Sequence, residues 1–420
     1  MLRRSFVAML PILPAAAAQN PMLVPPYINL GDDPARYALV FHTHPSTAIF
    51  TVRTGGREYP VSTVSIENPP HQVHTASIPP GDYEILLNGV SIFKSSVRAR
   101  PSVRHRFVML GDQGQNTAPQ RGLAEFAKSL DPDFLLFGGD MVYEYGRTID
   151  YQKKFFPHSY GVLRQRLWVA VPGNHDTDES NFTAHPDAYA FFHYLQQPLN
   201  GPILSTTPSL KGEPRYRDAF LKAAGAKFPR ALNFSFHYAN AHWTIIDTNK
   251  YNNMRDPKLR EWIEADLIAA QAFRWKFVGM HHPAFNSARK HAEQQHPRWL
   301  VDLFEKHNVD IVFSGHVHNY QRSYPLRFLN PSAGSGLVVR GNILPDKEGR
   351  NGVIYIVSGS GGAALHNGDQ EAKPKTWQPF TAAFRSRLHS LSVVDIDAGR
   401  LTFRQLTVSG RELDSFTIQK

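Results

Sequence analysis

Five short apolar runs, each followed by glycine or histidine and further polar side chains, constrain the fold of this chain more than any other feature. They cover residues 106–110, 134–137, 167–171, 277–280 and 310–313. Short apolar runs of this kind are typical of buried strands, and in open α/β sheets the functional groups gather at the carboxyl ends of the strands. The pattern therefore predicts an α/β fold with one sheet edge that is rich in polar side chains.

The polar side chains that follow these runs are oxygen and nitrogen donors suited to metal ions. They are Asp112, Asp140, Tyr143, Asn174, His281, His316 and His318. This set is too large for one tetrahedral zinc ion and suits two ions that share a carboxylate, for which Asp140 is the natural bridge. Each Gly-Asp or Gly-Asn pair alone is better explained by a turn, because Asp, Asn and Gly dominate turns. Their recurrence at successive strand ends favours a metal site.

The same residues form five ordered motifs. These are Gly-Asp-x-Gly from Gly111, Gly-Asp-x-x-Tyr from Gly139, Gly-Asn-His-Asp from Gly173, Val-x-x-His from Val278 and Gly-His-x-His from Gly315. The set resembles the signature of the purple acid phosphatases, a branch of the calcineurin-like metallophosphoesterases. The resemblance covers about residues 106–324, and Tyr143 separates this branch from relatives that lack the tyrosine.

The resemblance implies two metal ions with different ligand sets. The set for a ferric ion is Asp112, Asp140, Tyr143 and His318, and the set for a divalent zinc, iron or manganese ion is Asp140, Asn174, His281 and His316. A phenol with an ordinary pKa of about 10 is a poor ligand unless its partner is a strong Lewis acid such as Fe(III). We therefore expect Fe(III) plus one divalent ion as cofactors.

Four residues near the motifs are candidates for the remaining chemistry. By the resemblance, His175 faces the substrate and protonates the leaving group, and Asp176 is placed to orient or tune it. His291 matches the position of a second histidine on the substrate side, with a catalytic or substrate-binding role. His282 is the rival candidate for substrate binding.

The resemblance implies a metal-dependent phosphoric ester hydrolase of the acid phosphatase type. Its reaction would be attack of metal-bound hydroxide on a small phosphate monoester. A phosphodiesterase of the same superfamily remains an alternative. A non-catalytic envelope module that binds phosphate or a partner remains a second one, although such a module has no need of the complete donor set together with His175.

The first 18 residues have the pattern of a signal peptide. Arg3 and Arg4 precede an apolar segment, and four alanines at positions 15–18 offer a cleavage site. We therefore expect an exported, periplasmic or secreted protein without stable membrane insertion. The arginine pair followed by x-Phe-Val also resembles a twin-arginine signal, with general Sec export as the alternative.

The charge balance is basic, with a formal net charge of +10 at pH 7. A basic surface can steer anionic substrates such as phosphate esters. Because the lysines and arginines are dispersed without a long run, a nucleic-acid-binding protein is not expected. The chain has no Cys, so its stability does not depend on disulfides. The oligomeric state stays open.

The chain is long enough for two domains after the signal peptide. Residues 22–103 show short alternating strands separated by turn signals such as Gly55-Gly56, which predicts a small β-sandwich. It resembles the fibronectin III-like domain that commonly precedes the phosphatase domain in this family. Residues 104–420 are expected to form a two-sheet α/β sandwich, the metallophosphoesterase catalytic domain with C-terminal strands.

A long excursion at residues 176–233 interrupts the predicted alternation of strands and helices. It is rich in aromatic residues and leaves the strand end that carries Asn174 and His175. Two interpretations are equally good. The excursion either covers one wall of the site and shapes specificity, as long loops often do, or forms a structural aromatic cluster.

Overall fold

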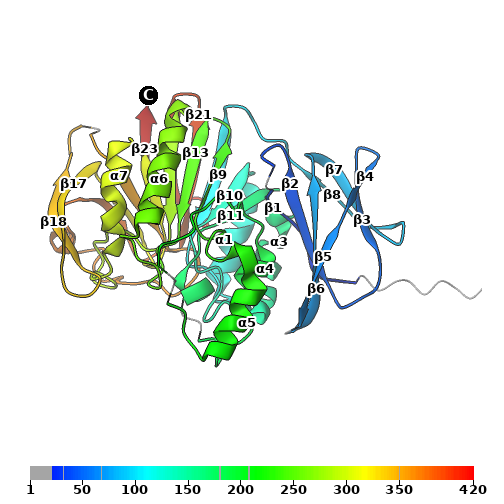
Figure 1. Ribbon diagram of the computed structural model, residues 1–420. Helices are drawn as coiled ribbons and strands as arrows, with labels where there is room; N and C mark the ends of the chain where they lie inside the picture. The colour runs from blue at the N-terminus through cyan, green and yellow to red at the C-terminus, as the bar shows by residue number, and fades with distance from the viewer. Residues whose placement is uncertain (1–20, 32, 68, 179–180, 207–208, 350) are drawn as a thin grey trace, which may run out of the picture.

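The computed structural model describes residues 21–420, except residues 32, 68, 179–180, 207–208 and 350. The predicted signal peptide lies outside the described residues. Figure 1 shows a β-rich part, coloured blue, at one end of the molecule and an α/β part beside it. Among the helices of the described part, none combines the length and the apolar character needed to cross a membrane.

A ten-stranded sheet extends through both parts of the molecule, in the order β23-β22-β21-β9-β10-β11-β1-β2-β6-β5. Its α/β half contains β9 (His105–Leu110), β10 (Phe134–Phe137), β11 (Leu167–Ala170), β21 (Ser390–Asp397), β22 (Arg400–Thr407) and β23 (Glu412–Gln419). The strands β9, β10 and β11 are parallel, and β21 to β23 extend them in antiparallel fashion. The predicted strand runs before Asp112, Asp140 and Asn174 therefore lie side by side.

The N-terminal strands form a small β-sandwich. One of its layers contains β1 (Met22–Leu30), β2 (Tyr37–Thr43), β5 (Ser62–Glu67) and β6 (Pro70–Ile78), and the other contains β3 (Phe50–Thr54), β4 (Arg57–Pro60), β7 (Gly81–Leu87) and β8 (Val90–Val97). Phe41 and Phe50 fill the space between the layers with ring centroids 5.3 Å apart. The order β1-β2-β6-β5 over β4-β3-β7-β8 is that of an immunoglobulin-like sandwich. The expected domain boundaries at residues 22–103 and 104–420 stay predictions.

The β-sandwich is not a separate sheet system. Strand β1 pairs in parallel with β11 through Ile28 and Leu167, so one layer of the sandwich continues directly into the sheet of the α/β part. The side chain of Asn29 reinforces this junction by donating to the carbonyl oxygen of Trp168 at 3.2 Å.

A second sheet of seven strands, in the order β12-β13-β14-β15-β19-β16-β20, lies face to face with the first. Its strands are β12 (Phe234–Tyr238), β13 (Ala241–Ile246), β14 (Trp275–Met280), β15 (Ile311–Ser314), β16 (Tyr320–Ser323), β19 (Ile354–Ser358) and β20 (Thr381–Arg385). Phe107 of the first sheet meets Trp243 and Phe313 of the second, with ring centroids 5.1 and 5.6 Å apart. The predicted two-sheet α/β sandwich is confirmed.

Helices cover the outer faces of both sheets, which explains why the strand runs are apolar on every residue instead of alternating. On the first sheet lie α1 (Ala118–Ser129) and α3 (Phe156–Leu163), and on the second lie α6 (Pro257–Ala269) and α7 (Val301–Lys306). The single-turn helix α2 (Thr148–Asp150) precedes α3 in the chain. In β9, Phe107 and Met109 face the second sheet, whereas Val108 and Leu110 face the helices.

The helix starts follow ordinary capping chemistry. Thr117 accepts a hydrogen bond from the Gln120 amide at 3.2 Å at the start of α1. Asp256 accepts from the Lys258 amide at 2.8 Å at the start of α6. Helices α1 and α6 also have proline in the first turn, where the missing N–H is no loss.

Single turns of other helix types occur at Tyr151–Phe155, Asn174–Asp178, Gly225–Lys227, Ala270–Ala272, His296–Leu300 and Pro374–Thr376. Strand β17 (Leu326–Ala333) pairs with β18 (Val339–Pro345) as a hairpin.

The excursion at residues 176–233 holds α4 (Ala190–Tyr194) and α5 (Pro214–Ala224). Its rings are buried and packed together: Phe192 and Phe220 have centroids 5.2 Å apart. The carbonyl oxygen of Tyr194 accepts a hydrogen bond from the Tyr27 hydroxyl of the β-sandwich at 2.7 Å. These rings therefore form a structural aromatic cluster that joins the excursion to the N-terminal part.

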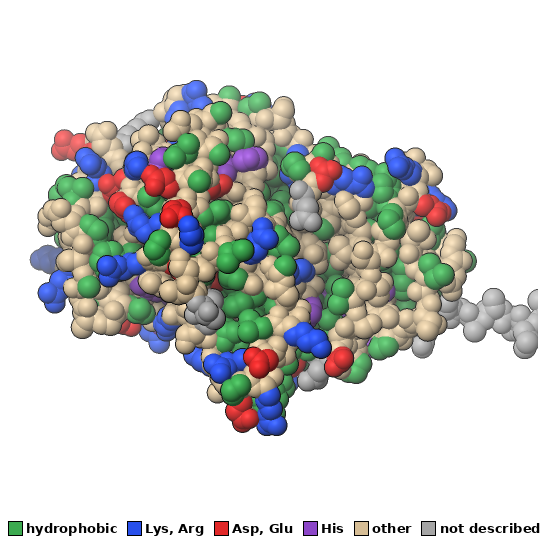
Figure 2. Space-filling model, viewed as in Figure 1, with side chains coloured by type: hydrophobic (Ala, Val, Ile, Leu, Met, Phe, Trp, Pro, Cys, Tyr) green, Lys and Arg blue, Asp and Glu red, His purple; other side chains and the backbone are tan. Residues whose placement is uncertain are grey.

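The charged side chains on the face shown in Figure 2 are of mixed sign. Lysines and arginines are interspersed with aspartates and glutamates, and they do not gather into one large patch on this face.

Candidate active site

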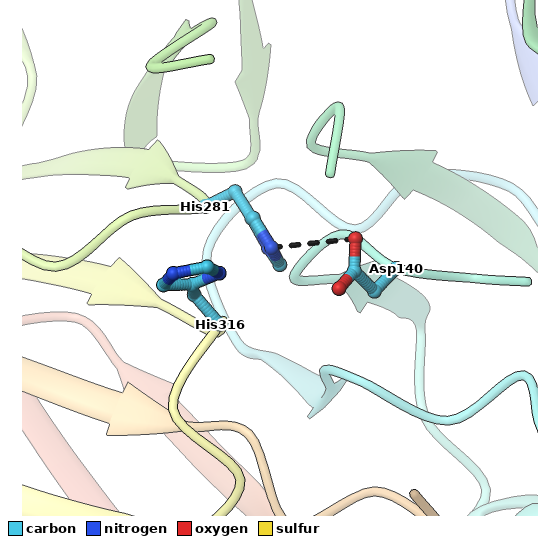
Figure 3. A group of neighbouring side chains, drawn as sticks. All are labelled: Asp140, His281 and His316. Carbon is cyan, nitrogen blue, oxygen red and sulfur yellow. Dashed lines mark ion pairs between the residues drawn. The ribbon is translucent and has the colours of Figure 1, made fainter. Parts of the chain in front are cut away.

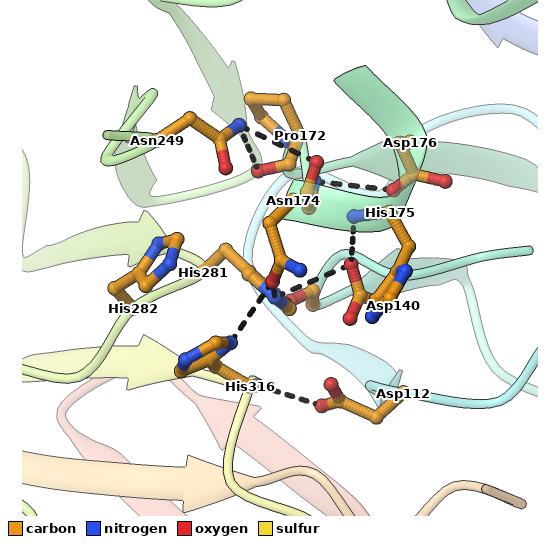
Figure 4. Close-up of polar contacts among 12 residues, drawn as sticks. Asp112, Asp140, Pro172, Asn174, His175, Asp176, Asn249, His281, His282 and His316 are labelled. Atoms are coloured by element: carbon orange, nitrogen blue, oxygen red, sulfur yellow. Dashed lines mark hydrogen bonds and ion pairs between the residues drawn. The ribbon is translucent and has the colours of Figure 1, made fainter. Parts of the chain in front are cut away.

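The carboxyl ends of the parallel strands of both sheets meet at one edge, and all of the predicted metal donors lie there. Figure 4 shows Asp112, Asp140, Asn174, His281 and His316 converging from separate loops. The donor atoms of the predicted aspartate and histidine ligands form two groups, and within each group all atoms lie within 4.8 Å of one another. One group is Asp140, His281 and His316, and the other is Asp112, Asp140 and His318. Figure 3 shows the first group. Asp140 belongs to both groups, so it occupies the position of a bridge.

The two remaining predicted donors complete these groups. Asn174 Oδ1 lies 3.0 Å from His281 Nε2 and 2.9 Å from His316 Nδ1. The Tyr143 hydroxyl lies 3.0 Å from His318 Nε2 and 3.4 Å from Asp112 Oδ1. In a neutral His281 ring whose Nδ1 donates to the Gly138 carbonyl oxygen, Nε2 and Asn174 Oδ1 are both acceptors, so a shared cation suits this pair better than a direct contact.

Backbone oxygens fix the ring atoms that two of the histidines present. His281 Nδ1 lies 2.8 Å from the Gly138 carbonyl oxygen, and His318 Nδ1 lies 2.7 Å from the Ala364 carbonyl oxygen. A carbonyl oxygen only accepts, so each Nδ1 carries the proton and each Nε2 is free to bind a metal. The backbone also orients the carboxylates: the amide of His316 donates to Asp112 at 2.8 Å.

The buried carboxylates and the phenol of the site would be stabilised in their ionised forms by a cation. Burial raises the pKa of Asp112 well above its ordinary value; His281 opposes this rise, and the charge of Asp140 adds to it. Burial also raises the pKa of the Tyr143 phenol, and the carboxylates of Asp140 and Asp112 raise it further. Metal ions would allow these groups to lose their protons together, because bound cations favour the ionised forms. The donor set therefore fits two metal ions.

The backbone of the donor loops is held in an uncommon conformation. Asp112, Asp140 and His316 have φ angles of 58°, 50° and 68°, in the left-handed region that non-glycine residues rarely adopt. Such conformations gather at functional sites, where the surrounding structure enforces them. Gly173 allows a close approach between two of these loops, since a Cβ there would lie 2.1 Å from the Asp140 amide nitrogen.

A glycine-rich segment at residues 359–362 packs closely against the loop that carries Asp112. A Cβ at Gly361 would lie 2.3 Å from the Gly111 carbonyl oxygen, and one at Gly359 would lie 2.7 Å from Asp112 Oδ2. The Ala363 amide donates to the Asp112 carbonyl oxygen at 2.9 Å. The glycines are therefore needed for close contact with the first donor loop.

His175 lies at the edge of the site, with 22% of its side chain exposed. Its ring centroid is 4.4 Å from that of Tyr143, and its Nδ1 lies 2.8 Å from the Glu144 carbonyl oxygen. Nδ1 therefore donates to this oxygen, which leaves Nε2 for the substrate side.

The contacts of Asp176 differ from the predicted one with the His175 ring. Its carboxylate accepts hydrogen bonds from the amides of Met141 and Gly173, each at 3.1 Å, and from the Tyr151 hydroxyl at 2.9 Å. Burial, followed by the charge of Asp140, raises its pKa to about 6. Asp176 therefore ties the loop after β10 to the loop after β11.

The two other candidate histidines lie on different sides of His316. The His282 side chain is fully buried, with its ring centroid 4.2 Å from that of His316 and its Nδ1 3.3 Å from Thr248 Oγ1. A side chain with no exposed surface does not meet a substrate that enters from solvent, so the position of His282 does not suit substrate binding. His291 is half-buried, and its ring centroid is also 4.2 Å from that of His316.

Two neighbours of the donors carry no signal in the sequence. The His366 ring stacks on that of His318 with centroids 3.9 Å apart and an interplanar angle of 9°, and its Nδ1 accepts from the His318 amide at 3.1 Å. The Gln294 side chain lies 2.7 Å from His316 Nε2. Both residues lie outside the five motifs, so only their tertiary positions identify them.

Fold and site together define a metallophosphoesterase with two candidate metal positions that share Asp140. The calcineurin-like phosphoesterase family matches residues 105–320 of the chain. The chain therefore belongs to this family, and the predicted likeness to purple acid phosphatases within it is confirmed by the relatives below.

Curated relatives include a purple acid phosphatase of Glycine max, which is 26% identical over 70% of this chain and 58% of its own length. A phosphoenolpyruvate phosphatase of Allium cepa is 26% identical over 72% of this chain and 58% of its own length. The alignments thus span less than two thirds of these relatives.

Solved structures show the same fold. The purple acid phosphatase PPD1 from yellow lupin (Lupinus luteus) superimposes with a TM-score of 0.71 at 19% identity, over 94% of this chain and 74% of that one. The structure of PhoD superimposes with a TM-score of 0.64 at 12% identity, over 97% of this chain and 92% of that one.

Proposed function

We propose that this protein hydrolyses phosphate monoesters with two metal ions at the site described above. The observation that carries the proposal is the position of Asp140, which belongs to both donor groups. Two cations that share a carboxylate supply charge for activating water and for stabilising a transferring phosphoryl group.

The residues of the chain supply the remaining parts of the reaction. We assign the proton for the leaving oxygen to His175 Nε2, because Nδ1 of the same ring donates to the Glu144 carbonyl oxygen. The amide of His175 donates to Asp140 Oδ1 at 2.9 Å, which ties the position of the acid to that of the bridging carboxylate. A general acid held in this way protonates the leaving group without having to move into place.

Positive charge beside the site favours a phosphate monoester, which is a dianion, over a phosphate diester, which carries a single negative charge. Burial, followed by the charge of Lys290, lowers the pKa of His291 to about 4; Lys250 acts in the same direction, and the charge of Glu293 opposes this lowering. Two lysines against one glutamate leave a net positive charge near His291, which favours an anionic substrate there.

We further propose that the ion beside Tyr143 is ferric and that the second ion is zinc, iron or manganese. The support is chemical: a phenol whose pKa is raised by burial and by two carboxylates becomes a ligand only for a strongly Lewis-acidic cation.

The test of the proposed reaction compares initial rates on p-nitrophenyl phosphate and bis(p-nitrophenyl) phosphate. We expect the monoester to be cleaved faster, and we expect chelation to abolish activity and added metal to restore it. A faster rate on the bis-ester would make the protein a phosphodiesterase. No hydrolysis of either ester by fully metal-loaded protein would favour the non-catalytic binding module.

We also propose that the protein is exported through its N-terminal segment. The support is the order of Arg3-Arg4, an apolar segment and four alanines. Replacing both arginines with lysine tests the twin-arginine route in cell fractionation. Retention of the variant in the cytoplasm would support that route, and unchanged export would favour Sec.

A further inference from the structure

The side chain of Gln294 lies between a candidate metal ligand and a candidate substrate-binding histidine. Its Oε1 is 2.7 Å from His316 Nε2, and its Nε2 is 3.0 Å from His291 Nδ1. Gln294 is 9% exposed and His316 is 5% exposed, so solvent does not compete strongly for these contacts. One carboxamide therefore joins two imidazoles through both of its polar atoms.

The position of His316 determines how this chain of hydrogen bonds must run. Its Nδ1 lies 2.9 Å from Asn174 Oδ1, among the donor atoms of the site (Figure 4). A nitrogen that binds a metal has no proton, so in a neutral ring the proton is on Nε2. His316 Nε2 then donates, and the atom of Gln294 that faces it must be the carbonyl oxygen.

The other end of the carboxamide is fixed by the same reasoning. The NH₂ group of Gln294 can only donate, so His291 Nδ1 must accept. The proton of a neutral His291 ring then lies on Nε2. The ring packs against His316 at a centroid distance of 4.2 Å, which limits its freedom to turn away from this contact.

We propose that Gln294 is a positioning residue that sets the tautomers of both histidines. It holds His316 as an Nδ1 ligand of the metal, and it holds His291 as a neutral ring that donates from Nε2 to a phosphoryl oxygen. The metal ligand His316 and the phosphate-binding His291 thereby belong to one hydrogen-bonded unit. This proposal rests on the proposed function, and it assigns a role to a residue outside the five motifs.

The backbone around Gln294 is anchored independently of this unit. The neighbouring Gln295 accepts from Arg298 Nη1 at 2.8 Å, and its amide donates to the Leu337 carbonyl oxygen at 3.0 Å. A change confined to the Gln294 side chain should therefore leave the turn in place.

The first test compares Gln294→Met, which removes both hydrogen bonds, with Gln294→Glu, which can accept from His316 but cannot donate to His291. We expect Gln294→Met to weaken Zn²⁺ binding by about 10- to 100-fold, as is typical for the loss of a partner of a metal-bound histidine. We expect Gln294→Glu to bind Zn²⁺ about as well as wild type but to bind inorganic phosphate more weakly. Calorimetry with Zn²⁺ and then with inorganic phosphate measures both.

The control variant is Gln165→Met, which makes the same chemical change just before β11, away from the strand ends that carry the donors. It should bind Zn²⁺ and phosphate as wild type does. Unchanged Zn²⁺ affinity in Gln294→Met would overturn the proposal.

A second measurement needs no variant. The ¹⁵N resonances of histidine-labelled, Zn²⁺-loaded wild-type protein distinguish a protonated from an unprotonated ring nitrogen. We expect His291 to carry its proton on Nε2, and a proton on Nδ1 would overturn the proposal. Because neither measurement uses turnover, failure to hydrolyse phosphate esters would reject the proposed function and leave the role of Gln294 to be decided by these measurements.

Discussion

At the scale of single residues, the candidate metal ligands differ in burial from His175, the proposed general acid. The candidate ligands are almost fully buried, whereas His175 keeps 22% of its side chain exposed. Its Nδ1 is occupied by the Glu144 carbonyl oxygen, so the ring has one nitrogen left for proton transfer. This arrangement suits a general acid better than a metal ligand.

Replacing His175 with alanine should therefore lower turnover without removing metal. Loss of a positioned general acid typically costs about 10²- to 10⁴-fold in rate. Steady-state kinetics on p-nitrophenyl phosphate, together with metal analysis of the same samples, would check this. A variant that loses a metal ion as well would show that His175 is a ligand.

Tyr143 offers a spectroscopic prediction. If a ferric ion binds its phenolate, the purified protein should show a broad visible absorption band that is absent from Tyr143→Phe. The hydroxyl lies 3.0 Å from His318 Nε2, so the substitution removes one donor and keeps the packing of the ring. A colourless wild-type protein that contains two metals would exclude the ferric-tyrosinate assignment and keep the wider metallophosphoesterase assignment.

At the scale of elements, the loops after the parallel strands depend on glycine for their close approach. The loop after β11 contacts the loop after β10 at Gly173, where a Cβ would lie 2.3 Å from Asp140 Oδ1. Neither loop is free to move, because Asp176 accepts hydrogen bonds from both of them. The spacing of the two candidate metal positions is therefore set by backbone packing.

Gly173→Ala should displace Asp140 and reduce the metal content of the protein. Overpacking of this kind typically costs about 1–3 kcal/mol, and here it falls on the shared carboxylate. The control is Gly161→Ala in α3, where the nearest atoms to a new Cβ are 3.4 Å away on the flexible Lys128 side chain. Elemental analysis should show full metal content in the control, and full content in Gly173→Ala would contradict the packing argument.

At the scale of the whole molecule, the β-sandwich and the α/β part share a sheet and a buried polar cluster. His42 of β2 donates from Nε2 to the Tyr27 hydroxyl at 2.9 Å, because that hydroxyl donates in turn to Tyr194. Burial lowers the pKa of His42 well below its usual value, and the nearby His71, His74 and His193 lower it further. These rings are therefore held neutral in the folded protein.

This cluster should make the folded protein less stable as the pH falls from about 6.5 to about 4. Burial lowers the pKa of His74 to about 4, from an ordinary value of 6.5. The unfolded chain therefore takes up protons that the folded chain does not, and the free energy of unfolding decreases with falling pH across this range. Urea unfolding of the metal-free protein at several pH values would measure the slope.

His42→Gln keeps an N–H donor for Tyr27 but cannot be protonated, so its stability should depend less on pH than that of wild type. The control His44→Gln makes the same change at an exposed position two residues along the chain. Equal slopes for wild type and His42→Gln would contradict the role of the cluster.

The amino-acid sequence by itself determined the parts of this protein that depend on local patterns. Buried parallel strands require continuous apolar runs, and loops that approach closely require glycine. The strands and the donors that follow them could therefore be predicted from the sequence. Thus Asp112, Asp140 and Asn174 were expected at one sheet edge, and the structure brings them there. The family assignment follows from the same motifs.

Only the tertiary structure decided the contacts between segments that no local pattern connects. The stacking of His366 on His318, the bridge made by Gln294, the partners of Asp176 and the pairing of β1 with β11 all belong to this group. Each depends on side chains or strand edges brought together by packing of the two sheets, and a histidine, glutamine or aspartate outside a motif gives no local signal of its partner. The sequence therefore predicted the donors of the site, whereas the residues that orient those donors became visible only in the folded chain.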